Sequence, residues 1–262
     1  MSLLWSELRL RRASLAIWVL AIALLMAMMA AVYPSIRGNP ELDSIYGSLS
    51  PSAQQLLGGS DLTSPAGYLS TQVFAFFLPA VIFVYALGRA AATLAGEEED
   101  RTLDLLLAQP LARWMAYAQK AAAVVIGIAV LCLATFVPLL AFNNAVHFEL
   151  PLANLAGIVT QLFLFCVALA MCTMALSAAA GRRAIGVAVV IGYIVVSYLV
   201  YGLSSTIAWM GRLRPLALWR WYAGNDPLRS GFGGAEVAVL LCTTVIAVLI
   251  GMWAFQRRDL HA

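Results

Sequence analysis

Residues Ala95 to Lys120 have the sequence A-G-E-E-E-D-R-T-L-D-L-L-L-A-Q-P-L-A-R-W-M-A-Y-A-Q-K, in which four consecutive acids precede a leucine-rich segment and a proline. Long apolar runs stand on both sides of this stretch. Charge placed between two apolar spans faces the water phase, because charged groups are costly inside a bilayer. We therefore interpret the stretch as a docking surface for a soluble partner.

The composition of the whole chain indicates a membrane protein. Of its 262 residues, 63% are hydrophobic and 11% are charged, whereas soluble domains carry about 25% charged residues. A soluble fold of this size cannot cover so much apolar surface, so lipid must be the solvent. The net charge of +3 is small, and we predict no nucleic-acid partner.

Six apolar segments are long enough to cross a bilayer, which takes about 20 residues per helix. The segments are continuous rather than alternating, which favours helices over a barrel. We predict a single all-α transmembrane domain over residues 1–262. Its spans are expected at about 15–35, 70–95, 116–142, 152–180, 184–208 and 234–255.

The basic residues indicate the orientation. With both termini in the cytoplasm, most of the 16 Lys and Arg residues fall in cytoplasmic segments, as the positive-inside rule requires. The last outer loop conflicts with this rule, because it contains Arg212, Arg214, Arg220 and Arg229. Residues 1–14 are predicted to form an interfacial helix on the inner leaflet, or alternatively a plain basic flank.

The segment after Thr102 is predicted to form a short amphipathic helix. Thr102 can cap its amino terminus, and Pro110 ends it. Leu103, Leu106 and Leu107 then share one face. A helix of under two turns has little stability alone, so this leucine face is expected to pack against a partner.

Spans two and five contain candidate residues for a transport path. Span two also contains Pro79, which removes a backbone donor and can kink the helix. The candidates are Phe76, Phe77 and Tyr85 in span two and Tyr193, Ser197 and Tyr201 in span five. For span two, the alternative is ordinary packing against lipid. The candidates of span five form one polar-aromatic stripe along the helix, which faces either a wet cavity or another helix.

Two outer segments are predicted to be structured, and no site is found in the first of them, residues 36–69. The segment Ser50 to Leu57 has a serine cap followed by Pro51 at the first helical position, which favours a short helix. Residues 209–233 contain several aromatic residues and the outer arginines, and Asn225-Asp226-Pro227 indicates a turn. We predict a half-buried amphipathic excursion in the outer leaflet.

No motif for catalysis or metal binding is present in the sequence. Lys120, the single lysine, follows no phosphate-binding loop, and no serine-hydrolase or zinc-peptidase motif occurs. His147 and Glu149 lack a third ligand, and the four cysteines lack metal-ligand spacing. The spans are almost free of acids, which argues against an ion-driven carrier. We predict no catalytic residue, no metal site and no cofactor bound by this chain.

The acidic stretch resembles the cytoplasmic loop of the ABC-2 class of ABC-transporter permeases. In that family the loop typically has the pattern E-x-E-x-G-T-L-x-x-L-L-x-x-P-x-x-R with a later lysine, and G-E-E-E-D-R-T-L-D-L-L-L-A-Q-P-L-A-R followed by Lys120 is similar to it. The N-D-P-L-R-S-G segment and the terminal F-Q-R-R-D-L also resemble the family. Arg101 departs from the pattern, because the family often has glycine there.

The resemblance implies a six-helix permease in a bacterial inner membrane, with a coupling helix in the loop after span two. It implies a second permease copy, identical or related, and two copies of a cytosolic ABC ATPase that bind ATP and Mg²⁺. The residues expected at the ATPase interface are Glu97, Glu98, Glu99, Arg101, Thr102, Leu103, Leu106, Leu107 and Arg113.

The expected function is ATP-driven export of a hydrophobic or amphiphilic molecule, such as a drug, lipid or natural product. The cargo path would lie between the two permeases, lined by spans one, two and five. Two other classes of function remain open at this point. The chain could be a membrane anchor or assembly protein that recruits a cytosolic partner, or a secondary carrier or channel.

Overall fold

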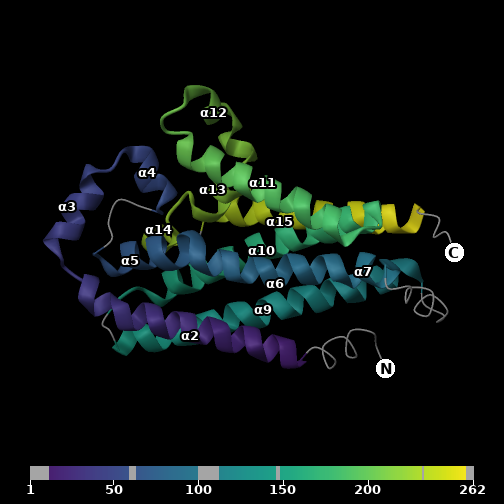
Figure 1. The fold of residues 1–262 in the computed structure, drawn as a ribbon, viewed down its shortest axis with the longest axis horizontal. Coiled ribbons are helices and arrows are strands. Elements are labelled where there is room, and N and C mark those ends of the chain that lie inside the picture. Colours follow the sequence, from purple (N-terminus) through teal and green to yellow (C-terminus); the bar gives the residue numbers. More distant parts are fainter. Residues whose placement is uncertain (1–11, 59–62, 100–111, 146–147, 232, 258–262) are drawn as a thin grey trace.

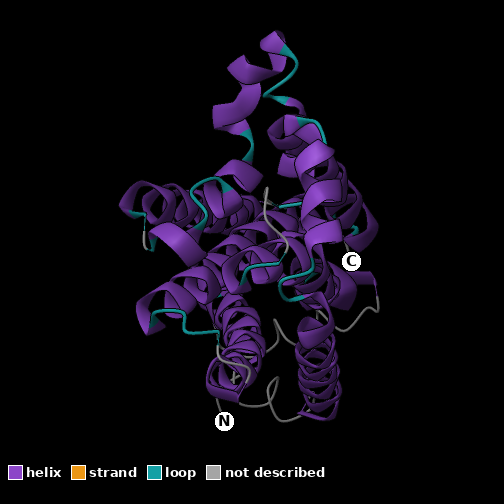
Figure 2. Cartoon of the chain, turned by 90° about the vertical axis from the view of Figure 1, so that its left-hand side faces the viewer, coloured by secondary structure: helices purple, strands orange, loops and turns teal. Residues whose placement is uncertain are grey.

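The computed structural model describes residues 12–58, 63–99, 112–145, 148–231 and 233–257. These residues form helices joined by short connections and contain no strand (Figure 2). Within these described ranges, six helical segments are long and apolar enough to cross a membrane. The prediction of an all-α protein with six spans is confirmed.

The spans lie close to the predicted segments. They are α2 (Arg12–Ile36), the continuous run of α5 (Pro65–Tyr68), η1 (Leu69–Phe77) and α6 (Leu78–Thr93), then α9 (Arg113–Ala145), α10 (Leu152–Ala180), α11 (Arg183–Leu203) and α15 (Gly234–Arg257). Span two begins earlier than predicted, because the Ser64 hydroxyl accepts a hydrogen bond from the Gly67 N–H at 3.1 Å and caps α5. Span five ends earlier, at a hydroxyl-rich turn where Ser204 Oγ donates to the Tyr201 carbonyl at 2.8 Å.

α10 lies at the centre of the bundle. It contacts α6, α9, α11 and α15, and it is the most buried of the six spans. Gly181 adopts a left-handed conformation (φ 67°) that ends α10 and permits the tight turn into α11. By contrast, α2, α11 and α15 expose large apolar side chains along their lengths, among them Leu20, Leu24, Val189, Val196, Ile246 and Ile250.

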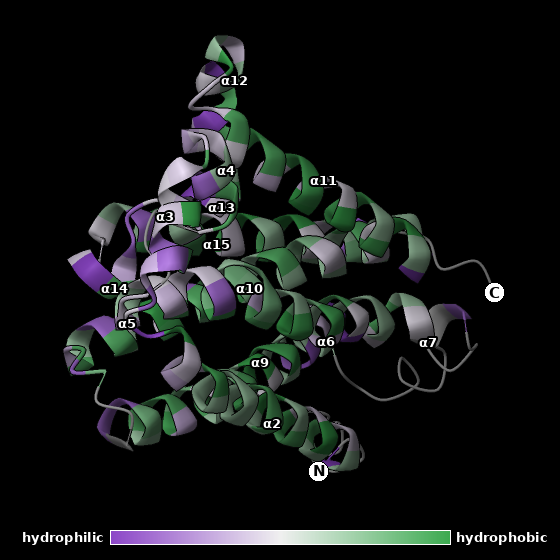
Figure 3. Ribbon diagram, turned by 60° about the vertical axis from the view of Figure 1, so that its left-hand side comes forward, coloured by the Kyte–Doolittle hydropathy of each residue, from purple (hydrophilic) through white to green (hydrophobic). Residues whose placement is uncertain are grey.

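Hydropathy along the structure matches a bilayer environment. The long helices are apolar over most of their length, and polar residues gather at the short helices of one end and near α7 (Figure 3). So large an exposed apolar surface is rare on soluble monomers. Lipid covers such a surface without cost, so the fold is that of a multi-pass membrane protein.

The two ends of the bundle are built differently (Figure 1). The cap end has the short helices α3 (Pro40–Ser48), α4 (Pro51–Leu56), α12 (Ala208–Leu213), η2 (Arg214–Leu216), α13 (Leu218–Ala223) and α14 (Pro227–Ser230). The loop end has α7 (Ala95–Glu99) and the turn between α10 and α11. The predicted helix after Ser50 is confirmed as α4, with Ser50 Oγ accepting from the Ala53 N–H at 3.3 Å.

Span two contains a π-helix, η1, in the half that lies toward the cap end. In η1 the backbone N–H of Leu78 donates to the Val73 carbonyl, five residues earlier. The next bond in this register would join the nitrogen of Pro79 to the Phe74 carbonyl, but proline has no N–H. The π-helix therefore ends there, and the Phe74 carbonyl needs a donor from elsewhere.

Candidate functional site

The predicted docking loop leaves the bundle at α7 and returns at α9. α6 ends at Thr93, and Leu94, with φ −118°, separates it from α7. Residues 100–111 lie outside the described part of the chain, as do the side chains of Glu97 and Glu98. The interface predictions for those two acids and for Arg101, Thr102, Leu103, Leu106 and Leu107 therefore fall outside the described structure. Arg113 is exposed at the start of α9.

Lys120 joins the returning side of the loop to the departing side. Its side chain is buried, with 1% of its surface exposed, and Nζ donates to the Thr93 carbonyl at 2.9 Å. Thr93 is the last residue of α6, where carbonyl groups lack partners within the helix and carry partial negative charge. The ammonium group satisfies one of these carbonyls, so α9 is tied to the end of α6.

Glu99 joins the departing side of the loop to span five. Its Oε2 lies 2.6 Å from Nε of Arg183, and its Oε1 accepts a hydrogen bond from the Arg183 backbone N–H at 3.0 Å. Arg183 is the first residue of α11. A carboxylate at a helix amino terminus accepts a hydrogen bond from a free N–H and interacts favourably with the positive end of the helix dipole. The sequence does not predict this contact, because the two residues are 84 positions apart.

The three path candidates in span two have two different environments. Phe76 and Phe77 are 56% and 46% exposed on the surface of the chain and contact each other edge to face. Tyr85 is buried, with its ring 6.1 Å from that of Trp18 in span one. Its hydroxyl occupies the space that a Cβ at Gly127 would take, so glycine permits close packing of α6 and α9.

The polar stripe of span five contacts η2 and α13. The Tyr193 hydroxyl donates to the Leu216 carbonyl at 2.8 Å, and the Tyr201 hydroxyl lies 3.4 Å from the Ala223 carbonyl. Ser197 Oγ accepts from the Trp219 N–H at 3.0 Å. The stripe therefore contacts another helical segment, and Tyr201 at its end also lines a pocket with Gln55 and Asp226.

The aromatic side chains of α13 fill the cap end between α6, α10 and α11. Trp219 and Tyr222 are buried, and the Tyr222 ring stacks on Phe165 of α10 at a centroid distance of 4.8 Å. Phe83 of α6 contacts Phe165 and Trp219 edge to face. Part of the predicted outer excursion is therefore core of the chain.

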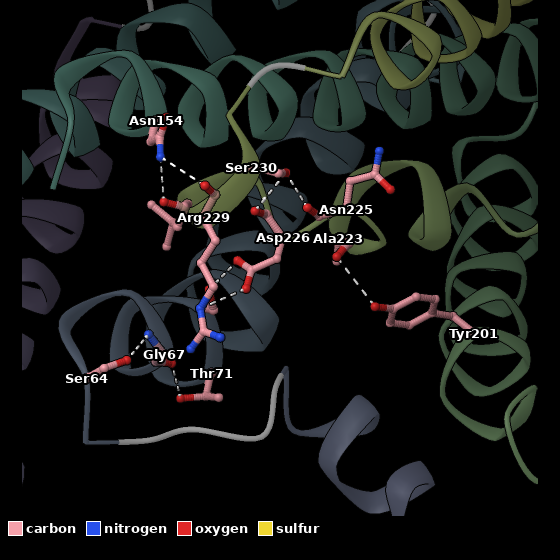
Figure 4. Close-up of polar contacts among 12 residues, drawn as sticks. Ser64, Gly67, Thr71, Asn154, Tyr201, Ala223, Asn225, Asp226, Arg229 and Ser230 are labelled. Atoms are coloured by element: carbon pink, nitrogen blue, oxygen red, sulfur yellow. Dashed lines mark hydrogen bonds and ion pairs between the residues drawn. The ribbon is translucent and has the colours of Figure 1, made fainter.

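The turn that follows α13 is held in place by hydrogen bonds and an ion pair (Figure 4). Asp226 accepts from Ser70 Oγ at 3.1 Å and lies 3.4 Å from Nε of Arg229. Asn154 of α10 donates to the Leu228 carbonyl at 2.8 Å. The N-D-P-L-R-S-G segment thus fixes α14 to spans two and four and acts structurally.

Comparison with known families agrees with this architecture. The sequence model of the family described as "ABC-2 family transporter protein" matches residues 1–260. A search of curated proteins by sequence found no match. The family match covers almost the whole chain, including all six spans. The chain therefore belongs to the ABC-2 family of transporter proteins and is a multi-pass membrane permease, a transport component that is not itself catalytic.

Proposed function

We propose that this chain is the membrane subunit of an ATP-driven exporter in a bacterial inner membrane. Two permease copies, identical or related, would bind two ABC ATPase subunits at the loop end, which faces the cytoplasm. ATP and Mg²⁺ would bind the ATPase subunits. The residues proposed to contact the ATPase are Glu97, Glu98, Arg101, Thr102, Leu103, Leu106, Leu107 and Arg113. We assign Glu99, which was predicted at the same interface, to its contact with Arg183 inside the chain rather than to the ATPase.

One observation carries this proposal: the segment between α7 and α9, here called the acidic loop, is bonded to neighbouring helices on both of its sides. Lys120 ties the start of α9 to the end of α6, and Glu99 ties α7 to α11. Burying an ammonium group is costly unless it is well bonded, and a simple connecting loop does not require it. Because both ends of the acidic loop are bonded to the spans, a force applied to the loop can reach the spans, as a coupling loop requires.

Charge at the loop end supports a cytoplasmic orientation. Arg113, Arg182, Arg183 and Arg257 all lie at helix ends on this side of the bundle. Short cytoplasmic segments carry an excess of basic residues. Arg212, Arg214, Arg220 and Arg229 depart from the rule and lie in the short helices of the cap end, from α12 to α14.

Exposed apolar and aromatic surface supports a hydrophobic or amphiphilic cargo. Phe76 and Phe77 are exposed, so they can contact lipid, a second permease copy or cargo. The path role of all six candidates stays a prediction. Phe76 and Phe77 are the first to test, because Tyr85, Tyr193, Ser197 and Tyr201 have contacts within the chain.

The docking assignment can be tested by co-purification. The tagged chain, isolated in mild detergent from its native membranes, is expected to carry an ATPase detected by mass spectrometry and by vanadate-sensitive ATP hydrolysis. Leu106→Asp should abolish both while the protein still inserts, because a charge cannot occupy an apolar groove. Leu57→Asp makes the same change at an exposed position of the cap end and should preserve both.

Two results would overturn the proposal. One is a wild-type chain that carries no ATPase. The other is a Leu106→Asp chain that binds the ATPase and supports hydrolysis as well as the wild type does. A membrane anchor would bind its partner without ATP-dependent change in the spans, and a secondary carrier would need no ATPase; family membership favours a transporter over the anchor.

A further inference from the structure

We propose that Glu99 and Arg183 form a clasp through which movement of the acidic loop reaches span five directly. This inference rests on the proposed docking of an ATPase at that loop. Chain connectivity links the loop only to spans two and three. The clasp adds α11, whose first residue is held by both oxygens of one carboxylate.

The local geometry makes Glu99 the capping group of α11. Within the described part of the chain, Arg182, the N-cap residue, makes no capping hydrogen bond with its own side chain. The Glu99 carboxylate supplies that bond from another helix, to the Arg183 N–H. The Arg183 guanidinium also lies over α7, with Nη1 3.9 Å from where a Cβ at Gly96 would stand. α7 and the first turn of α11 are thus in contact through both backbone and side chains.

The position of α11 gives the clasp a consequence at the opposite end of the bundle. At the cap end, Tyr193, Ser197 and Tyr201 of α11 contact η2 and α13. α13 carries Trp219 and Tyr222, which fill the core at that end. A displacement of the first turn of α11 is therefore transmitted along a rigid helix to the segment that closes the cap end.

The strength of the clasp suits a coupling contact better than a stabilising one. The Glu99 and Arg183 side chains are 31% and 50% exposed, and partly solvated ion pairs contribute little to stability. Removing the pair should leave the fold intact. Loss of the pair should uncouple α11 from movement of the acidic loop. A structural role would instead lower the stability of the fold.

Hydrogen–deuterium exchange on the permease–ATPase complex, with and without ATP and vanadate, tests the clasp. In the wild type, nucleotide should change exchange at the start of α9 and at the start of α11. In Glu99→Ala the change at α9 should persist and the change at α11 should disappear. Glu99→Gln retains an oxygen acceptor but lacks the charge, so its response at α11 should be intermediate.

Matched variants control for the loss of a charge. Arg183→Gln should behave like Glu99→Gln, whereas Arg182→Gln, at the neighbouring exposed arginine, should behave like the wild type. Glu41→Ala removes an exposed acid from the first turn of α3 at the cap end and should also have no effect. Melting temperatures of all variants should stay close to that of the wild type.

The outcomes distinguish this inference from the proposed function. A nucleotide response at α11 that survives in Glu99→Ala, or a wild-type response at α9 without one at α11, would overturn the clasp and leave the docking assignment standing. A wild-type complex without any nucleotide response would overturn both.

Discussion

The Tyr222 hydroxyl donates a hydrogen bond of 2.8 Å to the Phe74 carbonyl, at the point in span two where Pro79 cannot supply a backbone donor. Tyr222 lies in α13, 148 residues further along the chain. Its side chain is buried, and burial raises the pKa of its phenol well above the ordinary value, so the hydroxyl stays protonated and can donate. A side chain of the cap end thus completes the backbone bonding of a membrane span.

Tyr222→Phe should destabilise the fold by about 1–3 kcal/mol, because the Phe74 carbonyl would be left buried without a donor. Pro79→Ala restores an N–H that can bond this carbonyl in the π register. The cost of Tyr222→Phe should therefore be smaller in the Pro79→Ala background. Denaturant unfolding in mixed micelles measures the double-mutant cycle. Additive costs would contradict the assignment of Tyr222 as the replacement donor.

Gly186→Ala should destabilise the contact between α10 and α11. A Cβ at this position would overlap the Ser177 hydroxyl and lie 2.8 Å from both the Ser177 nitrogen and the Thr173 carbonyl oxygen. The backbone atoms cannot move aside, so overpacking should cost about 1–3 kcal/mol. Gly192→Ala is the control in the same helix, because no described atom lies within 4 Å of its Cβ position. Equal melting temperatures for the two variants would argue against the close approach.

Lys120→Met should weaken the contact between α9 and the end of α6 at the base of the acidic loop. The substitution keeps an unbranched side chain but removes a charged hydrogen bond to the Thr93 carbonyl, and bonds of this type contribute about 1.5–3 kcal/mol. We expect a lower melting temperature and faster amide exchange at the end of α6. Arg182→Met, which removes an exposed charge from the same end of the bundle, should leave both unchanged. Protected amides at the end of α6 in Lys120→Met would show that this bond does not brace the loop.

Asp226 should tolerate asparagine better than alanine. Its φ of 44° lies in the left-handed region, which costs most residues about 1–2 kcal/mol and is more accessible to Asp and Asn. Asn can also accept the bond from Ser70, whereas Ala cannot. The partner Arg229 is half exposed, so loss of the ion pair itself should matter little. We expect the highest melting temperature for the wild type, a lower one for Asp226→Asn and the lowest for Asp226→Ala. A melting temperature of Asp226→Ala above that of Asp226→Asn would exclude this explanation.

The sequence by itself determined the elements of the fold. Apolar runs of membrane length located six spans, because the bilayer requires about 20 residues per helix and no other solvent accepts such runs. The cap of α4 at Ser50 and the missing donor at Pro79 were also predicted, since a cap and a proline act within one helical turn. The span ends at Pro65 and Leu203 were missed by a few residues, because local hydroxyl caps rather than hydropathy set them.

Only the tertiary structure decided which residues meet. The contacts of Glu99 with Arg183 and of Tyr222 with Phe74 join segments 84 and 148 residues apart. The polar stripe of α11 left two alternatives open in the sequence, and the structure placed it against η2 and α13. In a membrane protein, side chains that face lipid and side chains that face the core are equally apolar, so hydropathy does not encode the rotation or depth of a helix. Rotation and depth follow from close packing at glycines such as Gly186 and from polar groups that must find partners, and both depend on the whole bundle.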